Sequence, residues 1–222
     1  MRQKGIIVAI DGPTASGKST TSKLAAKELG YLHINTGAMY RAFALYCKQW
    51  EVTNPDDSQV AALAERVYID FDESGNILLE GKAVADDIQA PEIAVLASQF
   101  STRVEVREKM VALQQEIGKD GGVVLDGRDI GTVVFPDAEL KVFLIASAEA
   151  RAQRRFDELS SKGISVDITT LTKEIEDRDR RDSERKLSPL RKADDAVELD
   201  TTELGIEEQV ARVVVLARKK LA

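Results

Sequence analysis

The sequence is poor in the side chains that most often build metal centres and thiol chemistry. Its 222 residues include one cysteine, Cys47, and one histidine, His33. A single cysteine cannot form an internal disulfide, which suits a reducing cytosol. Having only one cysteine and one histidine also excludes most protein metal clusters and argues against a Cys–His catalytic pair. Cys47 lies in an apolar helical pattern and His33 in a short apolar run, so we expect both side chains to be structural.

Long apolar runs and excess positive charge are also lacking. No stretch approaches about 18 apolar residues, so we expect no membrane span. The first apolar run begins within a few residues of the N-terminus, so we expect no signal peptide. The net charge is −7, which gives no basic footprint for nucleic acid. We therefore expect a cytoplasmic monomer without nucleic-acid or membrane partners, whose anion sites are built locally from clustered arginines.

The chain does have the pattern of a parallel α/β sheet. Hydrophobic residues make up 43% of it, enough for one core with an inserted lobe. Helical patterns alternate with short apolar runs, which is typical of a doubly wound fold with helices on both faces of the sheet. The last pattern, Ile206 to Leu221, places its apolar residues on one helical face. Five runs are the predicted strands: Gly5–Ile10, Tyr31–Ile34, Val123–Asp126, Leu140–Ala146 and Ala196–Leu199.

The connection between the second and third predicted strands is much longer than a helical crossover requires. Within it, Val67–Asp72 and Asn76–Glu80 alternate around Glu73, Ser74 and Gly75, which predicts a hairpin. Ala83–Ala85 is a candidate third strand, and Pro91 opens a predicted helix. We interpret residues 64–102 as a small α+β lobe inserted into a single core that spans residues 1–222.

Residues Gly12 to Ser19 read G-P-T-A-S-G-K-S, a complete G-x-x-x-x-G-K-[ST] phosphate-binding loop. It follows the first apolar run and opens an amphipathic stretch with Leu24, Ala25 and Leu29. Glycines let successive backbone N–H groups point at phosphate oxygens at a helix N-terminus. Lys18 can reach the outer phosphates, and the Ser19 hydroxyl can bind Mg²⁺. The motif predicts nucleotide phosphate binding.

A phosphate loop alone does not separate GTPases, motors and small-molecule kinases. Two charged clusters follow other predicted strands: Thr36 to Arg41 after the second, and Asp126-Gly127-Arg128-Asp129 after the third. Ligands meet the carboxyl ends of parallel strands, so both clusters would face the cleft of the phosphate loop. Thr36 could equally be a helix N-cap, which leaves the first cluster open. The second cluster places two carboxylates and an arginine at the end of a strand, which favours a functional role over an ordinary turn.

Two groups of arginines each fall on one face of a predicted helix. Ordinary i,i+4 ion pairs with nearby acids would also explain the second group, so the sequence leaves its role open. Separate arginines beside a phosphate loop fit phosphoryl transfer, where catalysis is mostly positioning and charge neutralisation. A phosphate acceptor would need no general base, which agrees with the scarcity of histidine. The groups are Arg151, Arg154 and Arg155, and Arg178, Arg181, Asp182 and Arg185.

These motifs together resemble those of the bacterial cytidylate kinases, a family of nucleoside monophosphate kinases, nearly end to end. The run D-G-R-D-I-G-T-V-V-F-P is highly specific. The resemblance implies transfer of the γ-phosphoryl of MgATP to CMP, and to dCMP, in pyrimidine metabolism. The segments that carry it are Ile10–Pro13, the phosphate loop, Asn35–Arg41, Ala97–Gln99, Leu125–Pro136, Arg178–Ser183 and Pro189–Leu190.

The resemblance also implies roles for individual residues. It implies that residues 64–102 bind the monophosphate and that a short lid, residues 151–182, closes over ATP. The catalytic cations would be Lys18, Arg128, Arg181 and Arg185. The ATP site would be Gly12, Pro13, Thr14, Ala15, Ser16, Gly17, Lys18, Ser19, Thr20, Arg154 and Arg155, with Ser19 and, more weakly, Asp126 at Mg²⁺. The CMP site would be Thr36, Arg41, Ser98, Arg107, Arg128, Asp129, Arg178, Asp182 and Arg185. Of these, Ser98, Arg107 and Asp129 would read the base.

Other functions stay open at this point. A kinase for UMP, dTMP or AMP differs only through the base-reading residues. A GTPase-type switch is disfavoured because the chain has no N-K-x-D motif for reading guanine. A scaffold with a vestigial loop is disfavoured because Lys18, Ser19 and the arginines are all present.

Overall fold

The computed structural model describes residues 5–72, 74–161 and 163–221. Two predictions reach beyond this part of the chain, since Glu73 of the predicted hairpin turn and Lys162 of the predicted lid lie outside it. A five-stranded parallel sheet forms the centre, in the order β2-β6-β1-β7-β8. All five predicted strands are confirmed, with ends that differ by no more than two residues. They are β1 (Ile7–Asp11), β2 (Leu32–Asn35), β6 (Val123–Gly127), β7 (Leu140–Ile145) and β8 (Val197–Asp200).

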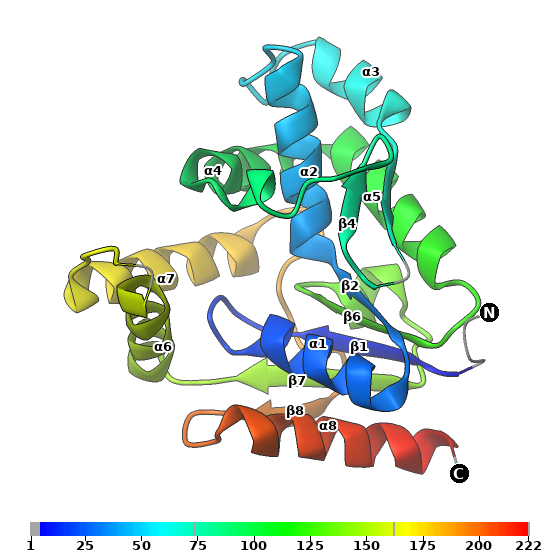
Figure 1. Cartoon of the computed structure of the whole chain (residues 1–222), viewed down its shortest axis with the longest axis vertical. Helices are drawn as coiled ribbons and strands as arrows, with labels where there is room; N and C mark the ends of the chain where they lie inside the picture. The colour runs from blue at the N-terminus through cyan, green and yellow to red at the C-terminus, as the bar shows by residue number, and fades with distance from the viewer. Residues whose placement is uncertain (1–4, 73, 162, 222) are drawn as a thin grey trace.

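Helices cover both faces of this sheet. Successive side chains of a strand point to opposite faces. Val8 and Ile10 of β1 accordingly belong to one hydrophobic cluster, with α1 (Lys18–Leu29) and α8 (Ile206–Leu221). Ala9 belongs to another cluster, with α2 (Thr36–Gln49) and α5 (Val104–Gly118). Figure 1 shows α1 and α8 together near the bottom of the view, with α2 and α5 above the sheet. Of the predicted amphipathic stretch, Ala25 is buried, whereas the Leu24 side chain is exposed.

A second, smaller sheet is antiparallel, in the order β3-β4-β5. Its strands β3 (Ile69–Phe71) and β4 (Ile77–Leu79) form the predicted hairpin. The third strand, β5 (Lys82–Ala83), lies slightly earlier than the predicted Ala83–Ala85. Around this sheet lie α3 (Gln59–Arg66), a 3₁₀ turn η1 (Asp87–Gln89) and α4 (Pro91–Phe100), which begins at Pro91 as predicted.

One continuous hydrophobic cluster joins the two sheets. Ile34 and Leu125 of the parallel sheet and Ile69 and Leu79 of the small sheet all belong to it. Cys47 on α2 lies fully buried in the same cluster, which confirms its predicted structural character. Burial raises the pKa of the Cys47 thiol to about 12, so the thiol stays protonated at neutral pH.

Three further elements complete the fold. A π-helical turn, η2 (Ile130–Val134), follows β6. The helices α6 (Ala148–Ser161) and α7 (Ile168–Glu184) pack against each other, to the left of the sheet in Figure 1. Within the part of the chain that the structure describes, no helix has the length and apolar character required to cross a bilayer.

Candidate active site

The register of the sheet brings three loops to one edge. Asp11 of β1 lies beside Gly127 of β6, and Asn35 of β2 lies beside Asp126 of β6. The carboxyl ends of three adjacent strands are therefore level with one another. Ligands of open α/β sheets bind outside such ends. The phosphate loop and both predicted charged clusters follow these three strands, so the structure brings them together.

The phosphate loop has the backbone that its glycines predict. Gly12 has a φ of 156°, and a Cβ at this position would lie 2.4 Å from the carbonyl oxygen of Leu144. Gly17 has a φ of 88° and ends the loop, directly before α1. No side chain caps the N-terminus of α1. A helix start without a side-chain cap leaves backbone N–H groups available for an anion.

Lys18 is buried at the start of α1. Its ammonium donates a hydrogen bond to the carbonyl oxygen of Pro13 at 2.8 Å. Burial, with repulsion from Arg128, holds the pKa of Lys18 well below its ordinary value. This ammonium group is therefore poorly solvated, and an arriving phosphate would stabilise its charged form.

Asp126, at the end of β6, contacts residues from three elements. The Ser19 hydroxyl donates to its carboxylate at 2.5 Å, and the Nε2 atom of His33 lies 2.7 Å from the other carboxylate oxygen. The Thr36 hydroxyl donates to its backbone carbonyl at 2.8 Å. His33 is thus a neighbour of the site, although the sequence suggested only a structural role. Thr36 is not the helix cap, because the Asn35 side chain accepts the Ala38 N–H at 2.7 Å.

The residues present fit a magnesium ion bound together with nucleotide phosphates. Mg²⁺ prefers oxygen ligands and commonly takes only one or two from the protein. Ser19 and Asp126 offer a hydroxyl and a carboxylate side by side. Among residues 5–72, 74–161 and 163–221, no cluster of three or more His, Cys, Asp or Glu side chains could hold a metal without such phosphates.

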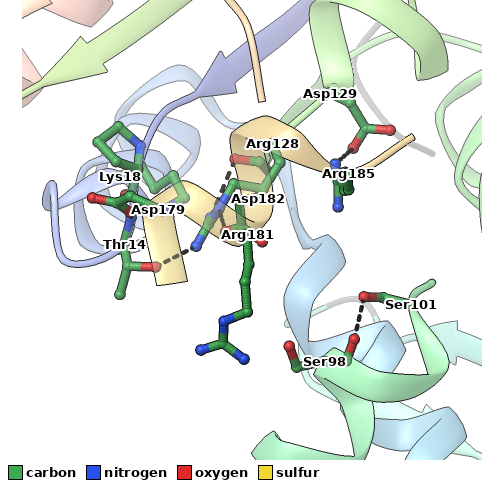
Figure 2. A network of polar contacts seen from close by, with 12 residues as sticks. Thr14, Lys18, Ser98, Ser101, Arg128, Asp129, Asp179, Arg181, Asp182 and Arg185 are labelled. Carbon is green, nitrogen blue, oxygen red and sulfur yellow. Dashed lines mark hydrogen bonds and ion pairs between the residues drawn. The ribbon is translucent and has the colours of Figure 1, made fainter. Parts of the chain in front are cut away.

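Arg128 connects the phosphate loop with α7. Its Nε donates to Asp182 at 2.8 Å, and its Nη2 donates to the Thr14 hydroxyl at 2.8 Å, as Figure 2 shows. Burial alone would raise the pKa of Asp182, but the Arg128 guanidinium holds it below its ordinary value. Desolvation and repulsion from Arg128 lower the pKa of nearby Arg178 to about 10. Positive charge is therefore concentrated between the loop and the helix.

A second buried cluster surrounds Asp129. Its carboxylate forms an ion pair with Arg107, and Arg185 Nη2 lies 3.5 Å from its other oxygen. The Arg107 guanidinium also lies over the Tyr40 ring, 5.9 Å from its centroid. Figure 2 shows Ser98 on a separate helix, where its carbonyl accepts a hydrogen bond from Ser101. Within the part of the chain that the structure describes, no hydrogen bond or ion pair joins Ser98 to this cluster.

Only some of the remaining predicted arginines reach the phosphate loop. Arg151 and Arg154 donate to the carbonyl oxygens of Thr14 and Ser16 at 3.1 and 3.5 Å. Arg155 is exposed and pairs with Glu158, so it does not join them. Arg181 is also exposed, and its Nε donates to the carbonyl oxygen of Asp177. Burial lowers the pKa of Arg41, whose Nε is buried without a hydrogen-bond partner.

Two acids at the site were missed by sequence reasoning. Asp179 on α7 accepts the backbone N–H of Thr14 at 3.1 Å and pairs with Arg151. Asp11 accepts two backbone N–H groups at the start of η2. The sequence did offer an indication of a role for Asp11, since this residue directly follows the first predicted strand, at the edge of the sheet where ligands bind. Asp179 had only its place in the segment Arg178–Ser183, one of those that carry the resemblance, which did not single it out among the acids of a charged helix.

This geometry defines a class of protein. A phosphate loop at the carboxyl edge of a parallel sheet, with arginines converging from other elements, is the arrangement of a phosphate-loop phosphotransferase. Comparisons with known proteins narrow this class. The family model for cytidylate kinase matches residues 8–219. The chain belongs to the cytidylate kinase family.

Curated relatives agree over nearly the whole chain. The sequence is 48% identical to a cytidylate kinase from Lactobacillus johnsonii, covering 99% of both chains. It is also 48% identical to a cytidylate kinase from Enterococcus faecalis, covering 97% of this chain and 96% of the relative. A solved gluconokinase from Sinorhizobium meliloti 1021 is a distant structural match, with a TM-score of 0.45 and 17% identity over 99% of this chain and 97% of that one.

Proposed function

We propose that this protein transfers the γ-phosphoryl group of ATP to CMP, and to dCMP, giving ADP and CDP or dCDP. The observation that supports this most directly is the position of Arg128. Its guanidinium contacts the phosphate loop through Thr14 and the neighbouring helix through Asp182. A cation held beside the phosphate loop can neutralise the charge of a phosphoryl group in transfer.

On the ATP side, backbone N–H groups of residues 14–20 and the Lys18 ammonium bind the phosphates, and Pro13, which has no N–H, shapes the loop. Arg154 approaches the same loop. Ser19 and Asp126 would hold Mg²⁺, which would neutralise phosphate charge when bound. Arg155 would have to turn from Glu158 to take part in ATP binding.

On the CMP side, Thr36, Arg41, Arg128 and Arg185 hold the monophosphate. Arg178 and Asp182 contact the ribose hydroxyls. Ser98, Arg107 and Asp129 read the base, with Arg107 donating to its O2 and N3 and Asp129 accepting from its N4 amine. The Arg107–Asp129 ion pair holds a donor and an acceptor together before the base is bound. Cytosine offers the complementary acceptor and donor, whereas uracil presents an oxygen to the carboxylate.

The chemical step needs no general base from the protein. A phosphate monoester has a second pKa near 6, so the acceptor is largely ionised at neutral pH. Its oxygen attacks the γ-phosphorus, the bond from that phosphorus to the β-phosphate oxygen breaks, and ADP leaves. Lys18, Arg128, Arg181 and Arg185 neutralise the charge on the transferred group. Arg181 would have to move from its exposed position to do so.

The proposal also assigns roles to two larger segments of the chain. Residues 64–102 form the monophosphate-binding lobe, and residues 151–182 form the lid over ATP. Closure of both would exclude water, which competes with CMP as an acceptor. The protein acts as a cytoplasmic monomer whose partners are its substrates.

The activity is tested with the purified protein, MgATP and each of CMP, dCMP, UMP, AMP, GMP and dTMP, by following ADP release. We expect fast release with CMP and dCMP and slow release with UMP. Equal release without an acceptor, or release chiefly with another monophosphate, would contradict the proposal.

The base-reading role is tested with Asp129→Ala. Because the carboxylate distinguishes the N4 amine from an oxygen, this variant should lose most of its preference for CMP over UMP while keeping its KM for ATP. The control is Asp137→Ala, at an exposed aspartate just beyond η2. An unchanged CMP to UMP ratio of kcat/KM in Asp129→Ala would remove Asp129 from base recognition.

A further inference from the structure

The start of the π-helical turn η2, directly after Asp129, is not capped in the usual way. Asp129 precedes the π-helical turn η2, but its own side chain makes no capping hydrogen bond to that turn. The carboxylate is instead paired with Arg107 and approached by Arg185. The first N–H groups of a helical turn need acceptors from elsewhere. The start of η2 therefore depends on another side chain.

Asp11 supplies these acceptors from the neighbouring strand. One of its carboxylate oxygens accepts the Ile130 N–H at 2.8 Å, and the other accepts the Gly131 N–H at 2.8 Å. Asp11 lies at the end of β1, beside Gly127 of β6, and is only 4% exposed. A buried carboxylate that uses both oxygens on backbone N–H groups fixes the position of that backbone.

We propose that Asp11 is a positioning residue for recognition of the base: by capping η2 it leaves the Asp129 carboxylate free and correctly placed for the cytosine N4 amine. This inference rests on the proposed base-reading role of Asp129. It assigns the selectivity for cytosine over uracil to Asp11, at the end of β1, and Asp129, just beyond β6, of which only Asp129 touches the substrate.

The other end of η2 is held as well. Gln115 on α5 donates to the carbonyl oxygen of Val134 at 2.9 Å, and the Lys141 ammonium donates to the carbonyl oxygen of Pro136. Lys141 also packs against η2, since a Cβ on Gly131 would lie 3.1 Å from its Cδ. Because contacts from β7 and α5 hold its far end, we expect loss of the Asp11 hydrogen bonds to displace η2 mainly at its start. Asp129 is the residue that such a shift would move.

The electrostatics support a specific task for Asp11. Burial raises the pKa of its carboxyl to about 6, against the stabilising effect of the two backbone N–H groups. An unneeded carboxylate at such a place would destabilise the fold. Its two hydrogen bonds to η2 explain why an acid stands here.

Asp11→Asn is the sharpest variant, because it keeps the shape of the side chain and removes one acceptor. An amide has one acceptor oxygen, and its NH₂ group can only donate. One of the two N–H groups of η2 therefore loses its partner. We expect the ratio of kcat/KM for CMP to kcat/KM for UMP to fall about tenfold, the usual scale for an unpaired buried group. The KM for ATP should stay within about twofold.

The experiment is a double-mutant cycle on the full chain. The CMP to UMP ratio is measured for the unchanged protein, Asp11→Asn, Asp129→Ala and the double variant. If Asp11 acts through Asp129, then Asp11→Asn should have no further effect on the ratio in the Asp129→Ala background. Asp57→Asn is the matched control, because Asp57 is a partly buried aspartate that also accepts a backbone N–H, from Gln59.

The outcomes separate this inference from the function on which it rests. If Asp129→Ala leaves the ratio unchanged, the base-reading proposal fails, whatever Asp11→Asn does. If Asp129→Ala lowers the ratio and Asp11→Asn does not, only the positioning role is overturned. A rise in the KM for ATP at a constant ratio would also overturn it, since Asp11 would then act on the phosphate loop. Should Asp11→Asn fail to fold by circular dichroism, Asp11→Glu tests the same point, because it keeps the charge but displaces both oxygens by one methylene.

Discussion

At the scale of single residues, charged side chains of the site are buried and poorly solvated. Lys18 is the clearest example, since its pKa is lowered chiefly by burial and its ammonium has a backbone carbonyl as its hydrogen-bond acceptor. Such a group gains more from a phosphate than an exposed lysine would, because little water must be displaced from it. The charged form of Lys18 is therefore disfavoured in the unbound enzyme and would be stabilised by a substrate phosphate.

Lys18→Ala should lower kcat by at least about a hundredfold, the scale expected when a preorganised charge contact to the transition state is lost. Its melting temperature should be unchanged or slightly raised, because a buried charge is removed. Steady-state kinetics and thermal unfolding measure the two effects. Lys23→Ala, at an exposed lysine on the same helix, is the control. Near-normal turnover in Lys18→Ala would exclude this lysine from the mechanism.

Asp11 should impose a pH dependence on stability. Burial raises its native pKa from 3.8 to about 6, so the folded protein binds a proton more tightly than the unfolded chain does. This contribution is fully present below about pH 4 and is lost as the pH rises through about 6. Its size is at most about 3 kcal/mol, at 1.36 kcal/mol per pKa unit. Denaturant unfolding between pH 4 and 7 should therefore show a steeper loss of stability in the unchanged protein than in Asp11→Asn, and parallel curves would contradict the assignment.

At the scale of elements, α7 contacts the phosphate loop directly. Asp179 accepts the Thr14 N–H and pairs with Arg151, which itself donates to the Thr14 carbonyl. A carboxylate on a phosphate-loop N–H occupies a position that a phosphate oxygen would take. ATP binding and this contact should therefore compete.

Asp179→Asn should bind ATP several-fold more tightly, because loss of the negative charge weakens the hold of α7 on the loop and releases Arg151. Isothermal titration calorimetry with ATP alone measures this change, and the KM for CMP should stay constant. Asp177→Asn provides the control, since Asp177 lies on the same helix and pairs with Arg180. Unchanged or weaker ATP binding in Asp179→Asn would show that the contact does not oppose ATP.

Elements differ in how far the sequence predicts them. Strands such as β1 and β6 are short apolar runs buried on both faces, and their composition alone marks them. The turn η2 is different, because it depends on a carboxylate acceptor from Asp11 and an amide donor from Gln115, which are both distant in sequence. The cap of α2 was also ambiguous, since Asn35 and Thr36 are both capping residues and only the hydrogen bond to Ala38 decides between them.

Contacts between residues distant in sequence also limit how far the site can be predicted. Motif spacing placed Lys18, Arg128 and Asp129 at one edge, because the ends of parallel strands meet there. Helical spacing also grouped Arg155 with Arg154, but a shared helix face does not decide which neighbour each guanidinium meets. Arg154 reaches the loop, whereas Arg155 pairs with Glu158 one turn away. Partners distant in sequence, such as Asp179, could be found only from the fold.

At the scale of the whole molecule, the two sheets share one hydrophobic cluster. A lobe whose core is continuous with that of the main sheet has little core of its own to keep it folded separately. We therefore expect both sheets to unfold in one transition. The single tryptophan, Trp50, is exposed at the end of α2 and is a fluorescent probe for that region.

Equilibrium unfolding in urea tests this prediction. Trp50 fluorescence and far-ultraviolet circular dichroism should give the same midpoint and slope, because coincident transitions by different probes indicate a two-state process. A fluorescence midpoint at clearly lower urea would show that the small sheet and its helices unfold first.

The buried Cys47 has a practical consequence. It is the only thiol in the chain, so a thiol-reactive dye can attach at one place only. The dye needs an ionised thiol that solvent can reach, and in the closed core Cys47 is neither accessible nor ionised at neutral pH. Labelling kinetics in the unmodified protein therefore record how often α2 parts from its neighbours, and the effect of each substrate on that opening can be timed without adding any engineered probe.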